Sequence, residues 1–317
     1  MVYLDRTIGI VIPCFNEESQ VRKVIDGLPA WIDSIVVIDD ASLDATSAVV
    51  KEMRNSDKRI SLIIHEENSG VGSAIASGYQ NAKSSNLDIA VVMAGDNQMS
   101  PNDLPKILNK MIQGNFDYVK TNRLFYKEAR KQIPRIRFVG NYILSILTKF
   151  ASGYWNISDS QSGFAAISNK ALNLIDWSEM YPRYGQPNDI LVLLNIANCR
   201  VADVPALPIY GVGEKSKMKI RIVAYKIPIL LLRRTFFRIS KKYFEAEMHP
   251  IFLFFLTSLL FLISGVALLI RMLFVKFTVG SFPFISTICA LFSFSIFLVL
   301  ALFALWFDYE RNLPLQE

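Results

Sequence analysis

Residues 91–101, VVMAGDNQMSP, contain the feature that decides the fold: an apolar run that ends abruptly in polar side chains. The run stops at Ala94, one carboxylate follows at Asp96, and a carboxamide follows two residues later at Gln98. Two oxygen donors at this spacing suit a hard divalent cation. An ordinary acidic turn has the same composition, so the remainder of the chain has to separate the two readings.

Similar apolar runs alternate with helical patterns through the first half of the chain. Strands are predicted at 8–12, 35–38, 60–64, 89–93 and 117–121, and helices at 18–29, 44–54, 71–83, 102–113 and 137–151. Strands that alternate with helices of this length are typical of βαβ units. We therefore predict an α/β domain built on a Rossmann-like, mostly parallel sheet.

Three of the predicted strands end in acidic segments: PCFNEE at 13–18, DDASLDAT at 39–46 and AGDNQ at 94–98. Ligands of open α/β sheets bind beyond the carboxyl ends of the strands. Carboxylates there can accept hydrogen bonds from a ribose or a base, and a divalent ion can neutralise a diphosphate. A dinucleotide fold needs a glycine-rich turn instead, and GVGSAI at 70–75 has Ile75 where the third glycine belongs. The pattern therefore disfavours a dinucleotide fold.

Five segments now form a recognisable series: IPCFNEE, VVIDDASLDAT, NSGVGSAIASGY, VVMAGDNQMSP and DSQSGF. In this order they resemble the family 2 glycosyltransferases with a GT-A fold. Within that family they most resemble the polyprenyl-phosphate glycosyltransferases, which include dolichol-phosphate mannose synthases. The resemblance covers about residues 7–220. It implies inverting transfer of a sugar from a nucleotide-diphosphate sugar, of the GDP-mannose or UDP-glucose type, to dolichyl or undecaprenyl phosphate.

The resemblance also assigns the donor site. Nucleotide-binding positions are Pro13, Phe15, Glu17, Asp39, Asp40, Gly95 and Asp96. Asp96 and Gln98 would hold a divalent metal, Mg²⁺ or Mn²⁺, while Ala94 stands where the family has a first aspartate. Two alternatives stay open because of this departure: an active enzyme with lower metal affinity, and a pseudoenzyme. For Asp39 and Asp40 a plain strand-end turn is the alternative, with Asp44 capping the next helix.

A second set of positions matches phosphate-binding residues of the family. The resemblance assigns catalytic roles to Asp96, Asp189, Arg123 and Arg137. For Asp189, positioning of the acceptor is the preferred role and general base the second choice. It assigns the acceptor phosphate to Arg135, Ser162, Lys215, Ser216 and Lys217. Guanidinium groups suit phosphate because their donors are paired, although exposed arginines also occur without any such role. GVGEKSKMK, at 211–219, lacks the arginine that related members carry there.

The C-terminal third predicts a membrane hairpin. Residues 251–270 and 277–307 carry no charge, so helices at about 250–271 and 284–307 can each cross a bilayer. Two buried core helices are the alternative. We divide the chain into a catalytic domain at 1–212, a basic juxtamembrane segment at 213–248 and two transmembrane helices within 249–308.

Charge is unevenly distributed along the chain. Residues 215–244 hold ten Lys or Arg and no acid, whereas the whole chain has a net charge of +6. The positive-inside rule places this segment, the catalytic domain and the C-terminus in the cytoplasm. Interleaved apolar residues predict an interfacial helix pair, broken near Pro228, on anionic lipid. A solvated helix face or a nucleic-acid patch is the alternative.

Other features narrow the function. Three cysteines without metal spacing predict free thiols, and two histidines argue against a histidine zinc site or base. No signal peptide is expected, because Asp5 and Arg6 precede only a short apolar run. Expected partners are a nucleotide-diphosphate sugar, polyprenyl phosphate and membrane lipid, not nucleic acid; homo-oligomerisation stays open.

A processive polysaccharide synthase is a rival function, but QIPRI at 132–136 lacks the tryptophan of its Q-x-x-R-W signature. A non-catalytic, membrane-tethered nucleotide-sugar binder is the other rival.

Overall fold

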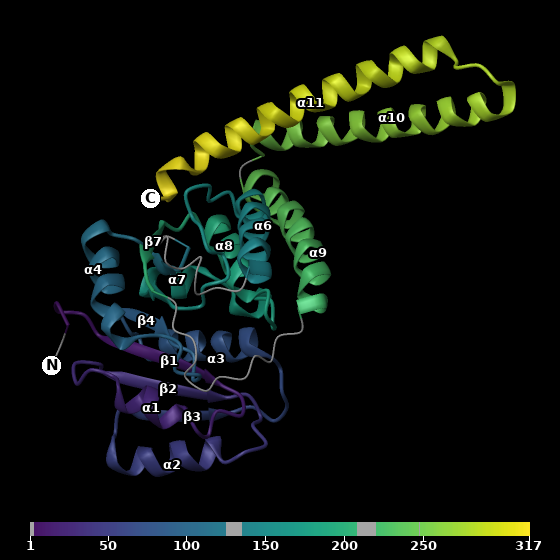
Figure 1. Ribbon diagram of the computed structural model, residues 1–317. Helices are drawn as coiled ribbons and strands as arrows, with labels where there is room; N and C mark the ends of the chain where they lie inside the picture. Colours follow the sequence, from purple (N-terminus) through teal and green to yellow (C-terminus); the bar gives the residue numbers. More distant parts are fainter. Residues whose placement is uncertain (1–2, 125–134, 208–219, 247) are drawn as a thin grey trace. The chain divides into compact units, whose positions relative to one another are not determined.

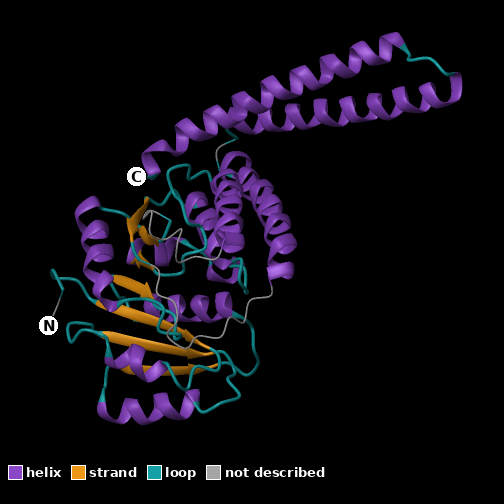
Figure 2. Ribbon diagram, in the orientation of Figure 1, coloured by secondary structure: helices purple, strands orange, loops and turns teal. Residues whose placement is uncertain are grey.

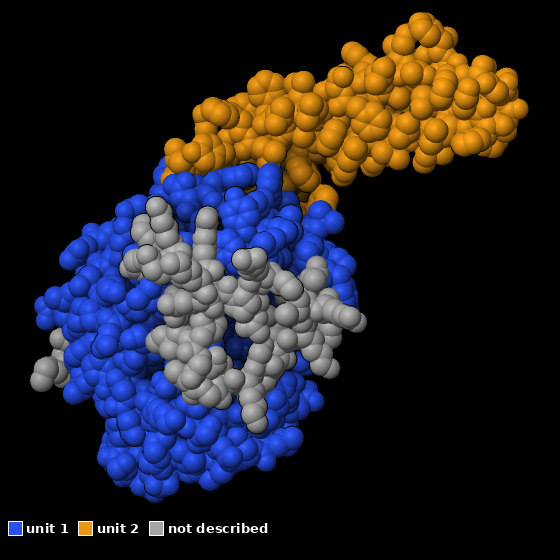
Figure 3. Space-filling model, in the orientation of Figure 1, with its two compact units in different colours: residues 1–235, 314–317 blue, residues 236–313 orange. Residues whose placement is uncertain are grey.

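A computed structural model describes residues 3–124, 135–207, 220–246 and 248–317; within these, the side chains of 135–137 and 220–224 are not described. The chain divides into two compact units, coloured separately in Figure 3. The first comprises residues 1–235 and 314–317, and the second comprises residues 236–313.

The first unit is built on a seven-stranded sheet whose order is β3-β2-β1-β4-β6-β5-β7. Its strands are the orange arrows of Figure 2. Its strands are β1 (Ile8–Cys14), β2 (Ser34–Asp39), β3 (Ile60–Ile64), β4 (Ile89–Val92), β5 (Tyr118–Asn122), β6 (Ala165–Ser168) and β7 (Val201–Pro205). Only β6 runs antiparallel to its neighbours β4 and β5; the other pairs are parallel. The prediction of a mostly parallel α/β sheet is therefore confirmed.

Helices flank this sheet along its length (Figure 1). They are α1 (Val21–Asp26), α2 (Thr46–Ser56), α3 (Val71–Ser84), α4 (Leu104–Gly114), α6 (Arg135–Ser152), α7 (Asn169–Leu174) and α8 (Gln186–Ile196). Each of the five predicted strands and five predicted helices is present, with ends shifted by a few residues. The sequence patterns did not predict β6, β7, α7 or α8.

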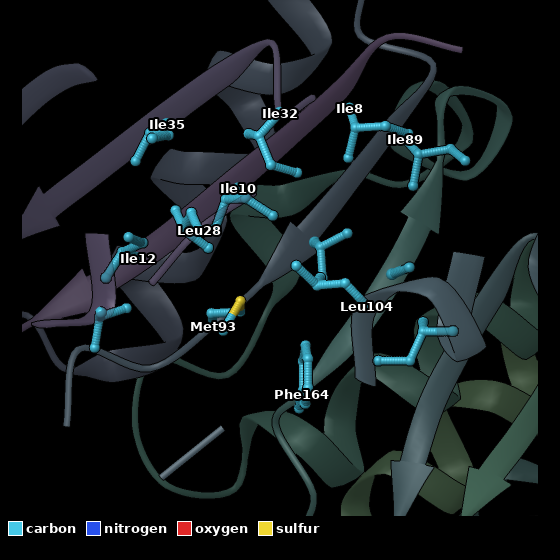
Figure 4. Packing of buried hydrophobic residues seen from close by; sticks show 14 of the residues in the cluster. Ile8, Ile10, Ile12, Leu28, Ile32, Ile35, Ile89, Met93, Leu104 and Phe164 are labelled. Atoms are coloured by element: carbon cyan, nitrogen blue, oxygen red, sulfur yellow. The ribbon is translucent and has the colours of Figure 1, made fainter. Parts of the chain in front are cut away.

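Both faces of the sheet are buried. Side chains of Ile8, Ile10 and Ile12 point from β1 into one apolar cluster (Figure 4), which also contains buried residues of α1, α2 and α4. Val11 points the other way, toward Gly78 of α3, where an added Cβ would lie 2.1 Å from Val11 Cγ1. A strand covered on both faces has no polar side to show. This explains why β1 reads as an unbroken apolar run.

The strand order places a topological switch point between β1 and β4. From β1 the chain builds outward to β2 and β3, and then returns to the opposite side of β1 as β4. The register pairs Cys14 with Asp39 and Val11 with Val92. The three acidic strand ends therefore lie beside one another, at the position where open α/β sheets bind ligands.

One prediction about the basic segment is wrong. Helix α9 (Ile220–Ile239) continues through Pro228 and is not a broken pair. Proline removes one backbone hydrogen bond from a helix, but packing holds this helix just before and after it. Ile227 and Leu231 are buried in a cluster with Ala151 of α6 and Val192 of α8, and these contacts hold α9 together across the proline.

The second unit contains two long helices, α10 (Pro250–Val279) and α11 (Phe284–Asn312). Their most apolar windows have mean hydropathies of 2.6 and 2.8, and only 11% and 17% of those windows are buried. A pair of core helices would be mostly buried, so this alternative does not fit. The two helices meet through small residues: Gly265 is buried, and an added Cβ there would lie 3.1 Å from the Phe294 ring. Close helix contact through small residues is typical of membrane helices.

A buried polar cluster lies in the second unit where α11 ends. Arg238 donates to both oxygens of Asp308, at 2.7 and 2.9 Å. Tyr243, in the π-helical turn Ser240–Glu245, donates to Asp308 Oδ1, and Lys242 Nζ donates to Asn312 Oδ1 at 2.8 Å. All five side chains are less than 10% exposed. Buried charges are tolerated when they are paired in this way.

The last residues of the chain return to the first unit. Gln316 forms a parallel bridge with Val201 of β7, and its side-chain Oε1 accepts a hydrogen bond from the Asn156 backbone at 2.8 Å. The Glu317 backbone N–H donates to the Val201 carbonyl at 3.2 Å.

Candidate active site

The loops after β1 and β2 are bonded to each other. The Leu43 N–H donates to Asn16 Oδ1 and the Glu17 N–H donates to Thr46 Oγ1, both at 2.8 Å. The N-cap position of α2 is Ala45, so the prediction that Asp44 is the cap is off by one residue; Asp44 instead accepts from the Thr46 N–H at 3.0 Å from just before the cap. These bonds fix Phe15 and Glu17, two predicted nucleotide contacts, beside the end of β2.

Gly95 brings the turn after β4 against the first loop. Its N–H lies 3.3 Å from the Pro13 carbonyl. An added Cβ would lie 2.6 Å from Cys14 Sγ and 3.6 Å from Glu17 Cγ. A side chain at this position would therefore push the two segments apart. The structure thus gathers Pro13, Glu17 and Gly95 at the switch point; their contact with a nucleotide stays a prediction.

Asp39 and Asp40 are both buried and both bonded within the chain. Asp39 Oδ1 accepts from the Ser42 N–H at 2.9 Å, and its Oδ2 contacts the Ser47 hydroxyl. Asp40 accepts from the Ser69 and Gly70 N–H groups at 3.0 and 2.8 Å. Asp40 thereby ties the end of β2 to the glycine-containing segment that precedes α3. Contact of either carboxylate with a nucleotide stays a prediction.

The glycine segment itself is bonded to protein. The Gly72 and Ser73 N–H groups donate to the Pro182 carbonyl, at 2.8 and 3.2 Å. These are the first N–H groups of α3, the ones that would hold a phosphate in a glycine-rich nucleotide loop. The contacts agree with the interpretation that GVGSAI is not a dinucleotide motif.

Three predicted segments line one pocket. Asp96 and Gln98 come from the turn after β4, Arg123 follows β5, and Ser162 and Gly163 precede β6. The remaining wall is formed by Met99, Ser100, Asp103, Thr121, Phe164, Ala206 and Leu207. The pocket thus brings carboxylate, amide, hydroxyl and guanidinium groups into one place.

Arg123 is held firmly at this pocket. Its Nε and Nη2 donate to the two oxygens of Asp159 at 2.8 and 2.9 Å, and its backbone N–H donates to Oδ2 at 2.8 Å. Burial acts to raise the pKa of Asp159, but the Arg123 and Lys120 charges and the Arg123 hydrogen bonds outweigh burial and lower this pKa below its ordinary value. Asp159 is therefore an ionised anchor for the arginine.

The loop that carries Ser162 is also anchored. Ser162 Oγ lies 2.5 Å from Thr121 Oγ1, and the Thr121 N–H donates to the Phe164 carbonyl at 2.9 Å. Asn188 of α8 accepts from Gln161 Nε2 at 2.7 Å and donates to Ser160 Oγ at 2.9 Å. The pocket wall is thus rigidly connected to β5 and α8.

Asp189 does not line this pocket among the described residues. It is fully buried in the first turn of α8, where Oδ2 accepts from the Tyr181 N–H at 2.6 Å and from Arg234 Nη2 at 3.0 Å. Burial raises the pKa of Asp189 above its ordinary value, and the charge of Arg234 opposes this shift. Its geometry is that of an internal ion pair.

The donor set at Asp96 and Gln98 fits a hard divalent ion. A carboxylate and a carboxamide oxygen come from the same turn, and the Gln98 N–H donates to Asp96 Oδ1 at 3.1 Å, which fixes the turn. Mg²⁺ is commonly held by one or two carboxylates together with substrate phosphates. Ala94 adds no side-chain oxygen, and no cluster of three acidic, histidine or cysteine side chains is found among the described residues. A metal here would therefore depend on ligand phosphates.

Some predicted site residues cannot be placed. Arg135 and Arg137 begin α6, but their side chains lie outside the described residues. Lys215, Ser216 and Lys217 also lie outside the described part of the chain. None of the three cysteines, all within the described residues, forms a disulfide, as predicted.

Sequence reasoning missed two charged side chains: Asp103, which lines this pocket, and Lys120, which is buried beside Asp159 and does not line it. Asp103 lines the pocket and pairs with Lys106 at 2.7 Å. Lys120 is 1% exposed, pairs with Asp203 at 2.9 Å and donates to the Asp159 carbonyl at 3.1 Å. The available signal was a lysine inside the strand sequence YVKTN. Lysines are rarely buried without a partner, so a lysine in a buried strand indicates a buried ion pair.

Comparison with known proteins agrees with this geometry. Residues 9–175 match the model of glycosyl transferase family 2. The chain belongs to this family and is a glycosyltransferase.

Relatives and solved structures extend the comparison. A UDP-N-acetylglucosamine--dolichyl-phosphate N-acetylglucosaminyltransferase of Methanococcus voltae is 30% identical over 72% of this chain and 96% of its own length. A dolichyl-phosphate beta-glucosyltransferase of Trichomonas vaginalis is 24% identical over 74% of each chain. Glucosyl-3-phosphoglycerate synthase of Mycobacterium tuberculosis, crystallised with Mn²⁺, UDP and phosphoglyceric acid, aligns with a TM-score of 0.56 at 19% identity, over 73% of this chain and 79% of that one. This last likeness supports the predicted GT-A fold.

Proposed function

We propose that this protein transfers a sugar from a nucleotide-diphosphate sugar to a polyprenyl phosphate, with inversion at the anomeric carbon. The observation that carries the proposal is the pocket that joins Asp96 and Gln98 to Arg123 and Ser162. The first pair suits a metal-bound diphosphate, and the arginine suits a phosphate oxygen.

The acceptor class rests on the relatives. Two of them are named for transfer to dolichyl phosphate, and a third, from Pectobacterium carotovorum, is an undecaprenyl-phosphate 4-deoxy-4-formamido-L-arabinose transferase, 30% identical over 40% of this chain. Dolichyl and undecaprenyl phosphates share a phosphate monoester on a long polyprenyl chain. That shared chemistry defines the acceptor proposed here.

The described residues have distinct roles in this reaction. Asp96 and Gln98 would hold a divalent ion, which when bound would neutralise charge on the leaving diphosphate. Arg123, oriented by Asp159, adds a fixed positive charge at the same pocket. The nucleotide lies at the ends of β1 and β2, against Phe15, Glu17 and Asp39.

The attacking group needs little activation. A phosphate monoester has a second pKa of about 6, so its oxygen is already anionic near neutral pH. Attack from the face opposite the diphosphate inverts the anomeric carbon. No strong general base is required, which agrees with Asp189 being buried in an ion pair.

Exposed apolar side chains support work at a membrane surface. Tyr225, Ile229 and Leu232 lie along one face of α9 and are each more than half exposed. Their spacing of four and then three residues puts them on one side of a helix. With two helices apolar enough to span a bilayer and the basic segment 215–244, we place the protein in a membrane, with its catalytic domain and C-terminus in the cytoplasm.

A transfer assay tests the proposal. Purified full-length protein would be mixed with dolichyl or undecaprenyl phosphate, a panel of radiolabelled UDP- and GDP-sugars, and either Mn²⁺ or a chelator. We expect a labelled lipid product from one donor class, with its anomeric configuration inverted. Nucleotide binding without lipid-linked product from any donor would contradict the proposal and favour a non-catalytic binder.

A further inference from the structure

Helix α9 reaches the catalytic domain through its inward face. Leu230 packs closely on Gly185. A Cβ added to Gly185 would lie 2.5 Å from Leu230 Cδ2. Ile227 and Leu231 pack against Val192. Arg234 follows on this face, with its side chain 13% exposed. The inward face therefore presents one largely buried cation to the start of α8.

Arg234 fixes the segment just before α8. Its guanidinium forms an ion pair with Asp189, with Nη2 at 3.0 Å from Oδ2, and it also donates to the Glu179 carbonyl. The same Asp189 oxygen accepts from the Tyr181 N–H at 2.6 Å. The ion pair thus holds backbone groups of residues 179 and 181.

This segment is in turn the support of the glycine segment. The Pro182 carbonyl accepts from the N–H groups of Gly72 and Ser73. The approach is close, because an added Cβ at Gly72 would lie 2.1 Å from the Tyr181 carbonyl oxygen. Gly70 has a φ of 101°, and an added Cβ there would lie 2.5 Å from the Pro182 oxygen. A shift of residues 181–182 therefore has to shift residues 70–73.

The glycine segment ends the series of contacts at β2. Ser69 and Gly70 donate their N–H groups to the carboxylate of Asp40. Asp40 adjoins Asp39, at the strand end where the proposed function places the base and ribose. Continuous hydrogen bonds and close packing thus connect Arg234 to the nucleotide end of the sheet.

We propose that Arg234 is a positioning residue for the nucleotide: acting through Asp189, it holds residues 179–182 against residues 70–73 and so sets the shape of the donor site. The inference rests on the proposed function and refines it, because Asp189 then serves the donor. The family resemblance alone would associate Asp189 with the acceptor.

Arg234→Gln, Asp189→Asn and the double variant test this proposal, with Lys226→Gln as a matched control on the exposed side of α9. Calorimetry with UDP and GDP gives the dissociation constant, and steady-state kinetics give KM for donor and acceptor separately. We expect the dissociation constant and the donor KM to rise about tenfold in each variant. The acceptor KM and the kcat at saturating donor should stay near wild type, because Asp189 does not line the pocket. Lys226→Gln should match wild type in nucleotide affinity and donor KM.

Each single variant leaves one charge buried without its partner, which can prevent folding. The double variant removes both charges and therefore avoids this problem. Its effect should be no larger than that of either single variant, because the residues act as one unit. A raised acceptor KM with unchanged nucleotide affinity would overturn the inference while leaving the proposed function intact. Failure of the wild-type chain to bind UDP or GDP would instead overturn the proposed function, and the inference with it.

Discussion

Arg123 and Asp159 form a two-pronged ion pair in which both carboxylate oxygens accept from the guanidinium, at 2.8 and 2.9 Å. Asp159 has no exposed surface, whereas the Arg123 side chain is 27% exposed and lines the pocket. The buried partner therefore orients the accessible one. A charge held in this way loses little conformational freedom when a phosphate binds.

This pair gives a pH-dependent prediction. The pKa of Asp159 is lowered in the folded protein, so its stabilising contribution is complete above the unfolded value of about 3.9 and is lost as pH falls through the lower folded value. Asp159→Asn should reduce the free energy of unfolding by about 2 kcal/mol at pH 7. The difference from wild type should shrink below about pH 4. Chemical denaturation in detergent across this range measures it. A difference that stays constant with pH, or an equal loss in exposed Glu67→Gln, would contradict the assignment.

The turn at Asp96 predicts opposite effects on metal-dependent activity for two substitutions. Asp96→Asn should abolish transfer while the protein stays folded, because the only charged metal ligand predicted in this turn is removed. Ala94→Asp should restore the family's first aspartate and lower the Mn²⁺ concentration needed for half-maximal activity, because a second carboxylate adds charge to the site. Metal titration of activity measures both effects. Asn102→Asp, which adds a charge at an exposed nearby position, is the control. Full activity of Asp96→Asn in excess chelator would exclude the metal role.

Asp39 is predicted to bind the base or ribose of the nucleotide. Asp39→Asn keeps the shape of the side chain but removes its charge, and the loss of a charged hydrogen bond is worth roughly 1.5–3 kcal/mol. We expect the dissociation constant for the preferred nucleotide to rise by about one to two decades. Calorimetric titration with GDP and UDP measures it, and Asp26→Asn on the exposed side of α1 is the control. An unchanged affinity for both nucleotides would leave Asp39 with only its bonds to Ser42 and Ser47.

Lys215 and Lys217 are predicted from sequence to contact the lipid phosphate. Replacing either with Gln should raise the KM for polyprenyl phosphate and leave nucleotide affinity unchanged. Kinetics at saturating donor, in neutral and in anionic vesicles, separate this role from surface attraction, which acts only on anionic lipid. Variants that differ from wild type only in anionic vesicles would show that both lysines are surface anchors.

The polar cluster at the end of α11 predicts a structural role for Asp308. Asp308→Ala leaves Arg238 buried without its counter-charge, which is expected to destabilise the second unit by about 3–5 kcal/mol. Thermal unfolding in detergent should show a clearly lower midpoint. Glu310→Ala, two residues further along the same helix and exposed, should unfold like wild type. Equal midpoints for the two variants would argue against the buried pair.

The sequence predicts strands well where burial leaves a pattern. β1, β2 and β4 are covered on both faces, and their apolar runs stand out. β6 is as short as β4, but its AAIS has two alanines and a serine where β4 has IAVV, so it gives no clear apolar run. Helix α8 buries Asn188, Asp189 and Asn195 among its apolar residues, so it lacks the contrast between faces that marks an amphipathic helix.

The candidate site is predicted where its residues form local motifs. Asp96, Gln98 and Ser162 belong to short recognisable segments, whereas Arg123 is assigned only by its position in the family resemblance; the fold brings all four to one pocket. The pairing of Lys120 with Asp203 joins residues 83 positions apart, and that of Asp189 with Arg234 joins residues 45 positions apart. Such partners depend on the packing of separate elements, so no local sequence pattern predicts them.

The short tail after α11 restricts how the chain can thread a bilayer. Gln316 and Glu317 bond to Asn156 and Val201, within the same compact unit as residues 1–235. A chain that leaves one folded body and returns to it must cross any intervening membrane an even number of times. A single crossing would not satisfy this parity, whereas two crossings, by α10 and α11 as the proposed function has them, would satisfy it. If α10 and α11 span a membrane as proposed, connectivity alone requires residues 316–317 and the catalytic domain to lie on the same side of it, whichever side that is.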